Sequence, residues 1–112
     1  SILRLMDIMS IKDAAQFTGL STDTLRYYER AGLLESVERN PGGHRRYSKV
    51  DLERLSFLAC LRATEMPIRL LKAYAALTRE GRATVPARIN LLEEHRNEVQ
   101  ARIEALQDSL AV

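Results

Sequence analysis

Two short amphipathic helices are predicted near the N-terminus. Ser10 is a suitable N-cap, small and apolar residues follow it at helical spacing, and Gly19 ends this first helix. After a tight turn, Ser21 caps a second helix that is expected to reach about Ala31, with Gly32 as its stop. Two helices joined in this way are typical of a helix-turn-helix, but bundles that bind no DNA contain the same pair.

The stretch from residue 33 to residue 47 has a different pattern. Apolar residues at 33, 34 and 37 precede the run Asn40-Pro41-Gly42-Gly43, which is rich in turn residues and cannot lie inside a helix. The basic run His44-Arg45-Arg46-Tyr47 comes next. We predict a two-stranded β-hairpin here, called a wing, with its tip near residues 41–43.

Three more helices are predicted after the wing. Ser48 and Asp51 have the spacing of a capping box, with Asp in place of Glu, and open a third helix that runs to about Thr64. Pro67 suits the first turn of a fourth helix, which Gly81 ends. The last helix is expected to begin at residues 85–86 and to continue without a break to the end of the chain.

The last helix carries a heptad seam, in which apolar residues recur at spacings of three and four: Ile89, Leu92, Val99, Ile103, Leu106 and Leu110. Roughly 25 residues make a helix of about 37 Å, longer than the surface of so small a domain can cover. We therefore expect the seam to form a coiled coil with a second copy of the chain. The alternative is that it folds back on its own head. Arg96 interrupts the seam and could fix the register of the pairing.

The composition favours a mainly α fold. The chain has 112 residues, enough for one compact domain and an additional element, and 46% of them are hydrophobic but only 5% aromatic. We predict a winged helix-turn-helix domain over residues 10–80 and a coiled-coil helix over 85–112. Residues 1–9 are read as a leader or a remnant outside the fold, and a native chain that continues past Val112 is plausible. No apolar run reaches the length of about 20 residues that a membrane span needs.

The positive charge is concentrated in the N-terminal half. The net charge is +2, while residues 51–112 hold nine Lys and Arg and nine Asp and Glu. The stretch from Arg39 to Lys49 contains basic residues and no acidic one. Such a local cluster suits a polyanion, although a solvated loop would have the same composition.

Residues for catalysis are hard to find. Neither His44 nor His95 has a histidine or cysteine neighbour at the spacing of metal ligands, and no glycine-rich loop lies between a strand and a helix. Cys60 is the only cysteine, so an intrachain disulfide is excluded. We expect no enzyme activity, no metal and no cofactor.

The second predicted helix offers side chains that suit DNA. Its first turn carries three hydroxyl groups, those of Ser21, Thr22 and Thr24. Arg26 can reach a phosphate or a guanine edge. Two adjacent tyrosines on a helix point about 100° apart, so Tyr28 is expected in the core and Tyr27 at the surface.

The wing supplies a second set of candidates. Arg45 and Arg46 alternate across the predicted strand, so one should face the DNA and the other can brace the head. Tyr47 ends the strand and is expected to pack on it, but it is kept among the DNA-binding candidates.

Several runs closely resemble the MerR family of regulators: residues 10–15, 18–21, 24–29 (Thr-Leu-Arg-Tyr-Tyr-Glu), 32–34 and the wing run 43–48. The resemblance implies a bacterial cytoplasmic, nucleoid-associated regulator that dimerises through an antiparallel coiled coil and binds double-stranded DNA at a promoter palindrome. It further implies that the activated form kinks and untwists this DNA so that RNA polymerase can engage it. The DNA contacts it implies are Thr24, Arg26, Tyr27, Arg45 and Arg46.

The inducing signal is open. The cysteines of the metal-sensing branches and the separate effector domain of the multidrug branches are absent from this chain. Residues 59–66 resemble a branch thought to respond to aldehydes or other electrophiles through one cysteine, which makes Cys60 a candidate thiol sensor. Glu65 stands where that branch usually has glycine. The alternative for Cys60 is a small buried core residue.

Two other functions remain open at this point. An architectural winged-helix protein of the excisionase type would bend DNA without an effector, but such proteins usually lack a dimer coil. A protein-interaction module would use the coiled coil alone, and the basic wing and Arg26 speak against it.

Overall fold

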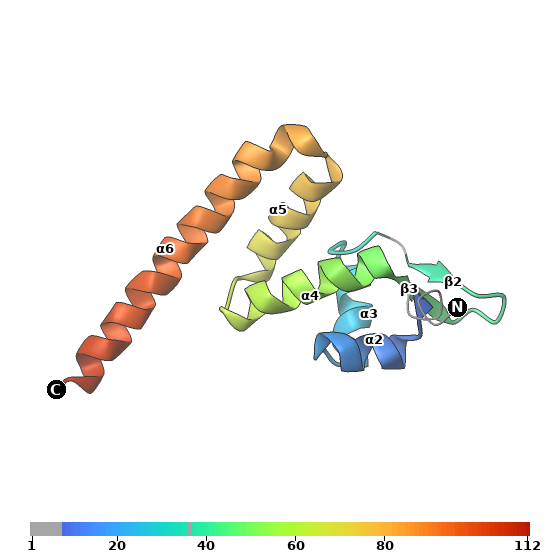
Figure 1. Cartoon of the computed structure of the whole chain (residues 1–112), viewed down its shortest axis with the longest axis horizontal. Coiled ribbons are helices and arrows are strands. Elements are labelled where there is room, and N and C mark those ends of the chain that lie inside the picture. The colour runs from blue at the N-terminus through green and yellow to red at the C-terminus, as the bar shows by residue number, and fades with distance from the viewer. Residues whose placement is uncertain (1–7, 36) are drawn as a thin grey trace. The chain divides into compact units, whose positions relative to one another are not determined.

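A computed structural model describes residues 8–35 and 37–112 of the chain. The chain divides into two compact units with the boundary between Glu65 and Met66. We call the described part of the first unit the head and the second unit the helical hairpin, and Figure 1 shows their elements in colours that run from blue to red along the chain. Most described residues are helical, as predicted from the composition.

The predicted helix-turn-helix is confirmed in the head. Helix α2 spans Ile11–Thr18 and helix α3 spans Thr22–Arg30. The side chains of Ser10 and Ser21 accept hydrogen bonds from the backbone N–H groups of Asp13 and Thr24, so each serine caps the helix assigned to it. Gly19 lies between the helices with a φ of 77°, a left-handed conformation that glycine adopts at no steric cost.

The wing contains one strand more than predicted. Strands β2 (Glu38–Arg39) and β3 (Arg45–Ser48) form the expected antiparallel hairpin. Strand β1 (Ile8–Met9) pairs with the other edge of β3, which gives the sheet order β1-β3-β2. Assigning residues 8 and 9 to a leader was therefore wrong, because their backbone belongs to the sheet. Residues 1–7 of that predicted leader lie outside the described residues.

Helix α4 spans Lys49–Ala63 and begins directly after β3. The predicted capping box is present: Ser48 Oγ accepts from the backbone N–H of Asp51, and the Asp51 carboxylate accepts from the backbone N–H of Ser48. Helix α2 contacts both α3 and α4. The buried apolar side chains of the head come from these helices, the wing and the segment before it: Ala14, Leu25, Tyr28, Leu33, Leu34, Val37, Tyr47, Leu52, Leu55 and Leu58.

The helical hairpin consists of α5 (Ile68–Arg79), a short 3-10 helix η1 (Arg82–Thr84) and α6 (Val85–Leu110). Helix α5 packs against α6. The sequence placed the fourth helix in the head, whereas the structure groups it with the long helix, so the boundary between the units falls earlier than the predicted one. None of the helices in the described ranges has the length and apolar character that crossing a membrane requires.

Candidate nucleic-acid interface

The first turn of α3 presents the hydroxyl groups that the sequence singled out. Ser21 Oγ accepts from the Thr24 backbone N–H at 3.0 Å and donates to Thr24 Oγ1 at 2.9 Å. The Ser21 hydroxyl is thereby occupied in capping the helix. Ser21 is exposed, while Thr22 and Thr24 are half-buried. The start of α3 thus combines accessible hydroxyl groups with backbone N–H groups, an arrangement that favours a phosphate.

The middle of α3 separates its two tyrosines as predicted. Tyr28 is 2% exposed and belongs to the core, whereas Tyr27 is 41% exposed. Arg26 lies on the surface as well and pairs with Asp23 one turn earlier, with 3.2 Å between Arg26 Nη1 and Asp23 Oδ1. This ion pair is solvated, because the Asp23 side chain is 94% exposed. Such pairs contribute little to stability, so the arginine can exchange the carboxylate for a phosphate.

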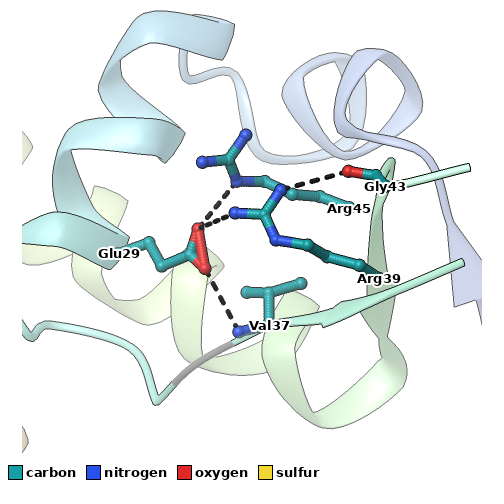
Figure 2. Close-up of polar contacts among 5 residues, drawn as sticks. All are labelled: Glu29, Val37, Arg39, Gly43 and Arg45. Carbon is teal, nitrogen blue, oxygen red and sulfur yellow. Dashed lines mark hydrogen bonds and ion pairs between the residues drawn. The ribbon is translucent and has the colours of Figure 1, made fainter.

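The last turn of α3 is joined to the wing by one carboxylate (Figure 2). Glu29 Oε1 accepts a hydrogen bond from Nε of Arg45 on β3 at 2.7 Å. Glu29 Oε2 accepts from the backbone N–H of Val37, directly before β2, at 3.3 Å. Arg39 on β2 brings Nη2 to 3.8 Å from Glu29 Oε1 and donates from Nη1 to the carbonyl of Gly43 at 3.2 Å.

The charge of Glu29 is held by these partners. Burial by itself raises the pKa of the Glu29 carboxyl. The hydrogen bonds from Arg45 and Val37 and the positive charges of Arg45 and Arg39 outweigh that effect, so the pKa lies below its ordinary value. Glu29 is therefore ionised at neutral pH, and its side chain is only 14% exposed.

The two wing arginines have different surroundings. The Arg45 side chain is 20% exposed and its guanidinium is bonded to Glu29, whereas Arg46 is exposed. The alternation along β3 thus gives one arginine that braces the head and one that faces solvent, as predicted. Whether either arginine touches DNA stays a prediction.

Tyr47 is a correction to the predicted set of DNA-binding residues. Its side chain is fully buried in the head, so it cannot touch DNA in this conformation. Burial raises the pKa of its phenol, and among the described residues its hydroxyl has no hydrogen-bond partner. The strand alternation explains the burial, because Tyr47 and Arg45 point to the same side of β3, toward the head.

Cys60 and Glu65 lie at the C-terminal part of α4 and just after it. Cys60 is exposed, so its alternative interpretation as a buried core residue is wrong. Glu65 has a φ of 64°, the only positive φ among the described non-glycine residues. The conformation at this position is one that suits glycine, the residue expected there by resemblance.

The predicted seam on α6 is uncovered over much of its length. Ile89, Ile103, Leu106 and Leu110 are exposed, while Leu92 and Val99 are half-buried. Every described residue of α6 from residue 100 onward is exposed in the single chain. Among the residues that the structure describes, no group of three His, Cys, Asp or Glu side chains is arranged to hold a metal ion.

Sequence reasoning missed Glu29 and Arg39 as parts of this interface. Sixteen positions separate Glu29 from Arg45, so no helical or strand period connects them. The available signals were indirect: Glu29 closes the run that carries the family resemblance, and Arg39 begins the basic stretch. Only the fold brings these side chains to one point.

The fold and this surface together define a winged helix-turn-helix protein with an appended long helix. Two family profiles match the chain: the profile of the MerR family regulatory protein covers residues 10–47, and that of the MerR DNA-binding region covers residues 52–112. The chain belongs to the MerR family.

Individual relatives agree with this membership. The HTH-type transcriptional regulator AdhR of Bacillus subtilis is 41% identical over 88 residues, which are 79% of this chain and 63% of AdhR. A crystal structure from Listeria monocytogenes, assigned to the MerR family of transcriptional regulators, has 40% identity and a TM-score of 0.84 over 92% of this chain and 78% of its own. HiNmlR, a MerR family regulator that lacks the sensor domain and was crystallised with promoter DNA, has 35% identity and a TM-score of 0.83 over 94% of this chain and 80% of its own.

Proposed function

We propose that the protein is a transcriptional regulator that binds a promoter palindrome as a homodimer. The observation that carries the proposal is the head surface: α3 exposes Ser21 and Tyr27 and presents the half-buried Arg26, and a wing braced on the same helix exposes Arg46. A helix of this kind suits the major groove and the wing suits the flanking backbone. The similarity to HiNmlR, which was crystallised with promoter DNA, supports this assignment.

The dimer is formed by α6 in this proposal. Ile103, Leu106 and Leu110 lie on the part of the heptad seam beyond residue 100, where every described residue is exposed in the single chain. Exposed apolar stripes of this length mark association surfaces. An antiparallel pairing of two α6 helices places two identical heads at opposite ends, which matches two half-sites of a palindrome.

Regulation follows from distortion of the DNA. The two heads hold their half-sites in a bent and untwisted duplex, and the protein–DNA contacts offset a deformation energy of about 1–6 kcal/mol. RNA polymerase then engages promoter elements that the straight duplex presents in the wrong relative orientation. The protein acts on DNA in the cytoplasm, without enzyme activity of its own.

The inducing signal is an electrophile that reacts with Cys60. The exposed thiol is accessible to small molecules. Its thiolate adds to the carbonyl carbon of an aldehyde: the carbon–sulfur bond forms as the C=O π bond breaks, and the carbonyl oxygen takes a proton from water, which gives a hemithioacetal. A reporter assay with an aldehyde as inducer tests this part, with Cys60→Ala against the wild type and Ser56→Ala, one helical turn earlier on α4, as the control. An unchanged response of Cys60→Ala would exclude the sensor role.

The decisive experiment is a mobility shift with footprinting on the region upstream of the protein's own gene, at two salt concentrations. We expect protection of a short palindrome and an affinity that falls steeply with salt. If the folded protein bound that region no better than unrelated DNA, the protein would have no operator upstream of its own gene. If a genome-wide binding selection also found no preferred site, sequence-specific regulation would be excluded.

A further inference from the structure

We propose that Glu29 is a positioning residue that sets the place of the wing relative to the recognition helix α3, and that Arg45 acts through Glu29 rather than by contacting DNA. This inference rests on the proposed DNA-binding function. It divides the wing arginines by role: Arg45 holds the wing in place and Arg46 meets the phosphates.

The position of Glu29 along α3 allows this role. It lies seven residues beyond Thr22, so roughly 10 Å of helix separates the carboxylate from the turn that would enter the groove. Between these two points Tyr27 is exposed and the Arg26 side chain is 40% exposed, whereas the Glu29 side chain is largely buried. One end of the helix is thus available for DNA while the other end is attached to the wing.

The two carboxylate oxygens of Glu29 hold two different parts of the wing, strand β3 and the residue directly before strand β2. Oε1 holds the Arg45 side chain of β3, and Oε2 holds the backbone N–H of Val37, which leads into β2 (Figure 2). A rotation or shift of the wing relative to α3 would lengthen at least one of these bonds. Arg39 links the turn of the wing to the same carboxylate, because its guanidinium lies near Glu29 Oε1 and also donates to the Gly43 carbonyl.

The chemistry of the site makes the carboxylate hard to replace. Both contacts donate a hydrogen, so both oxygens must accept. Glutamine has nearly the same shape but offers one acceptor oxygen and one NH₂ group. In Glu29→Gln, one donor from the wing would therefore face another donor, and the largely buried charge of Arg45 would lose its counter-ion.

The environment of Arg45 favours the brace over a DNA contact. The Nε–H group of Arg45 carries a single hydrogen, and it donates that hydrogen to Glu29 Oε1 at 2.7 Å. Its neighbour Arg46 lies on the other side of β3 and is exposed. Charge-assisted hydrogen bonds of this length are the strong ones, so the phosphate would have to displace a well-placed carboxylate.

The test compares Glu29→Gln with Asp23→Asn by hydroxyl-radical footprinting and affinity on the promoter fragment. Both variants remove one negative charge from α3 and one partner of an arginine, but Asp23 is 94% exposed and pairs within the helix. We expect Glu29→Gln to lose the protection at the flanks of each half-site, keep the central protection and bind about tenfold more weakly. Asp23→Asn should keep both protections.

Arg45→Lys is the second variant and remains informative if Glu29→Gln unfolds. Lysine retains the charge and can contact a phosphate, but it lacks the fixed Nε donor that Glu29 accepts. Loss of the flanking protection in Arg45→Lys supports the brace, and an unchanged footprint overturns it. A double variant Glu29→Gln, Arg45→Lys should weaken binding no more than the stronger single variant, because both act through one contact.

The outcomes separate this inference from the proposed function. Absence of any specific footprint with the wild-type protein overturns the proposed function and the inference with it. A normal wild-type footprint that survives in either Glu29→Gln or Arg45→Lys overturns the inference alone.

Discussion

Glu29 Oε1 and Arg45 Nε lie 2.7 Å apart although sixteen positions separate the two residues in the sequence. The pair connects the end of the recognition helix to the middle strand of the wing. The head therefore presents helix and wing as one unit, and its geometry depends on a carboxylate that no DNA atom needs to touch.

The ionisation of Glu29 predicts how stability depends on pH. The pKa of this carboxyl is lowered in the folded protein relative to its ordinary value of 4.5. A group of this kind stabilises the fold above its unfolded pKa, and that stabilisation is lost as the pH falls through the folded pKa. Wild type should therefore exceed Glu29→Gln in free energy of unfolding by about 1–3 kcal/mol near neutral pH.

The same difference should shrink below pH 4.5 as the folded carboxyl becomes protonated. Urea unfolding of both proteins across this range measures it, at one fixed protein concentration because a dimer's stability depends on concentration. A difference that stayed constant down to the acid limit would show that Glu29 contributes by shape and not by charge.

The conformation of Glu65 predicts a stabilising substitution. A non-glycine residue with φ near 64° is strained, and glycine relieves the strain at some cost in chain entropy. We expect Glu65→Gly to raise the free energy of unfolding by about 0.5–1 kcal/mol relative to Glu65→Ala, which keeps the strained backbone. Thermal unfolding of the two variants makes the comparison, and equal stabilities would contradict the strain.

Local signals in the sequence predicted most of the fold. Ser10, Ser21 and Ser48 each cap the helix expected of them, because capping depends on neighbours within three residues. Strand β1 escaped prediction because two residues carry no period, and its pairing is decided by β3 forty positions away. The place of the fourth helix also depends on tertiary packing and was assigned to the wrong unit.

The candidate site was predictable to a smaller extent. The exposure of Tyr27, the burial of Tyr28 and the division between Arg45 and Arg46 follow from the helix and strand periods. The same strand period puts Tyr47 on the inner side of β3 together with Arg45. Keeping Tyr47 among the DNA-binding candidates disregarded that period. The link from Glu29 to two strands joins residues far apart in the sequence, and only the assembled head reveals it.

The connection between α5 and α6, which we call the elbow, offers a test of what stabilises the helical hairpin. The Thr84 hydroxyl contacts the carbonyl oxygens of Leu77 at 2.6 Å and Gly81 at 2.7 Å, and Arg88 donates to that hydroxyl and to the Gly81 carbonyl. Thr84→Val keeps the shape and removes the contacts of the hydroxyl from a buried position, while the bond from Arg88 to the Gly81 carbonyl remains. We expect a loss of about 1–3 kcal/mol in thermal or urea unfolding.

Thr78→Val is the matched control for Thr84. Its hydroxyl donates to the Tyr74 carbonyl one turn earlier in the same helix, a bond that duplicates the helical one. We expect a change of less than about 0.5 kcal/mol there. A comparable loss in both variants would mean that the elbow contributes nothing beyond an ordinary helical threonine.

The seam on α6 predicts a dimer that one charge can break. Leu106 is 66% exposed in the single chain and lies at a seam position. In Leu106→Glu, dimerisation would bury an unpaired carboxylate, and the dissociation constant should rise about a hundredfold or more. Ala105→Glu introduces the same charge one residue away from the seam. Sedimentation equilibrium should find Ala105→Glu dimeric and Leu106→Glu monomeric; two dimers would exclude this seam as the interface.

The exposed wing arginine predicts a change in the salt dependence of DNA binding. Each phosphate contact releases condensed counterions, so log K falls against log salt with a slope of about −0.9 per contact. Arg46 is exposed on β3, and a dimer carries two copies. Arg46→Ala should make the slope shallower by about 1.8, while Arg46→Lys should leave it unchanged. Titrations at several salt concentrations measure both slopes. A slope unaltered in Arg46→Ala would show that the solvent side of the wing does not meet the DNA backbone, and would assign the phosphate contacts to the α3 end of the head.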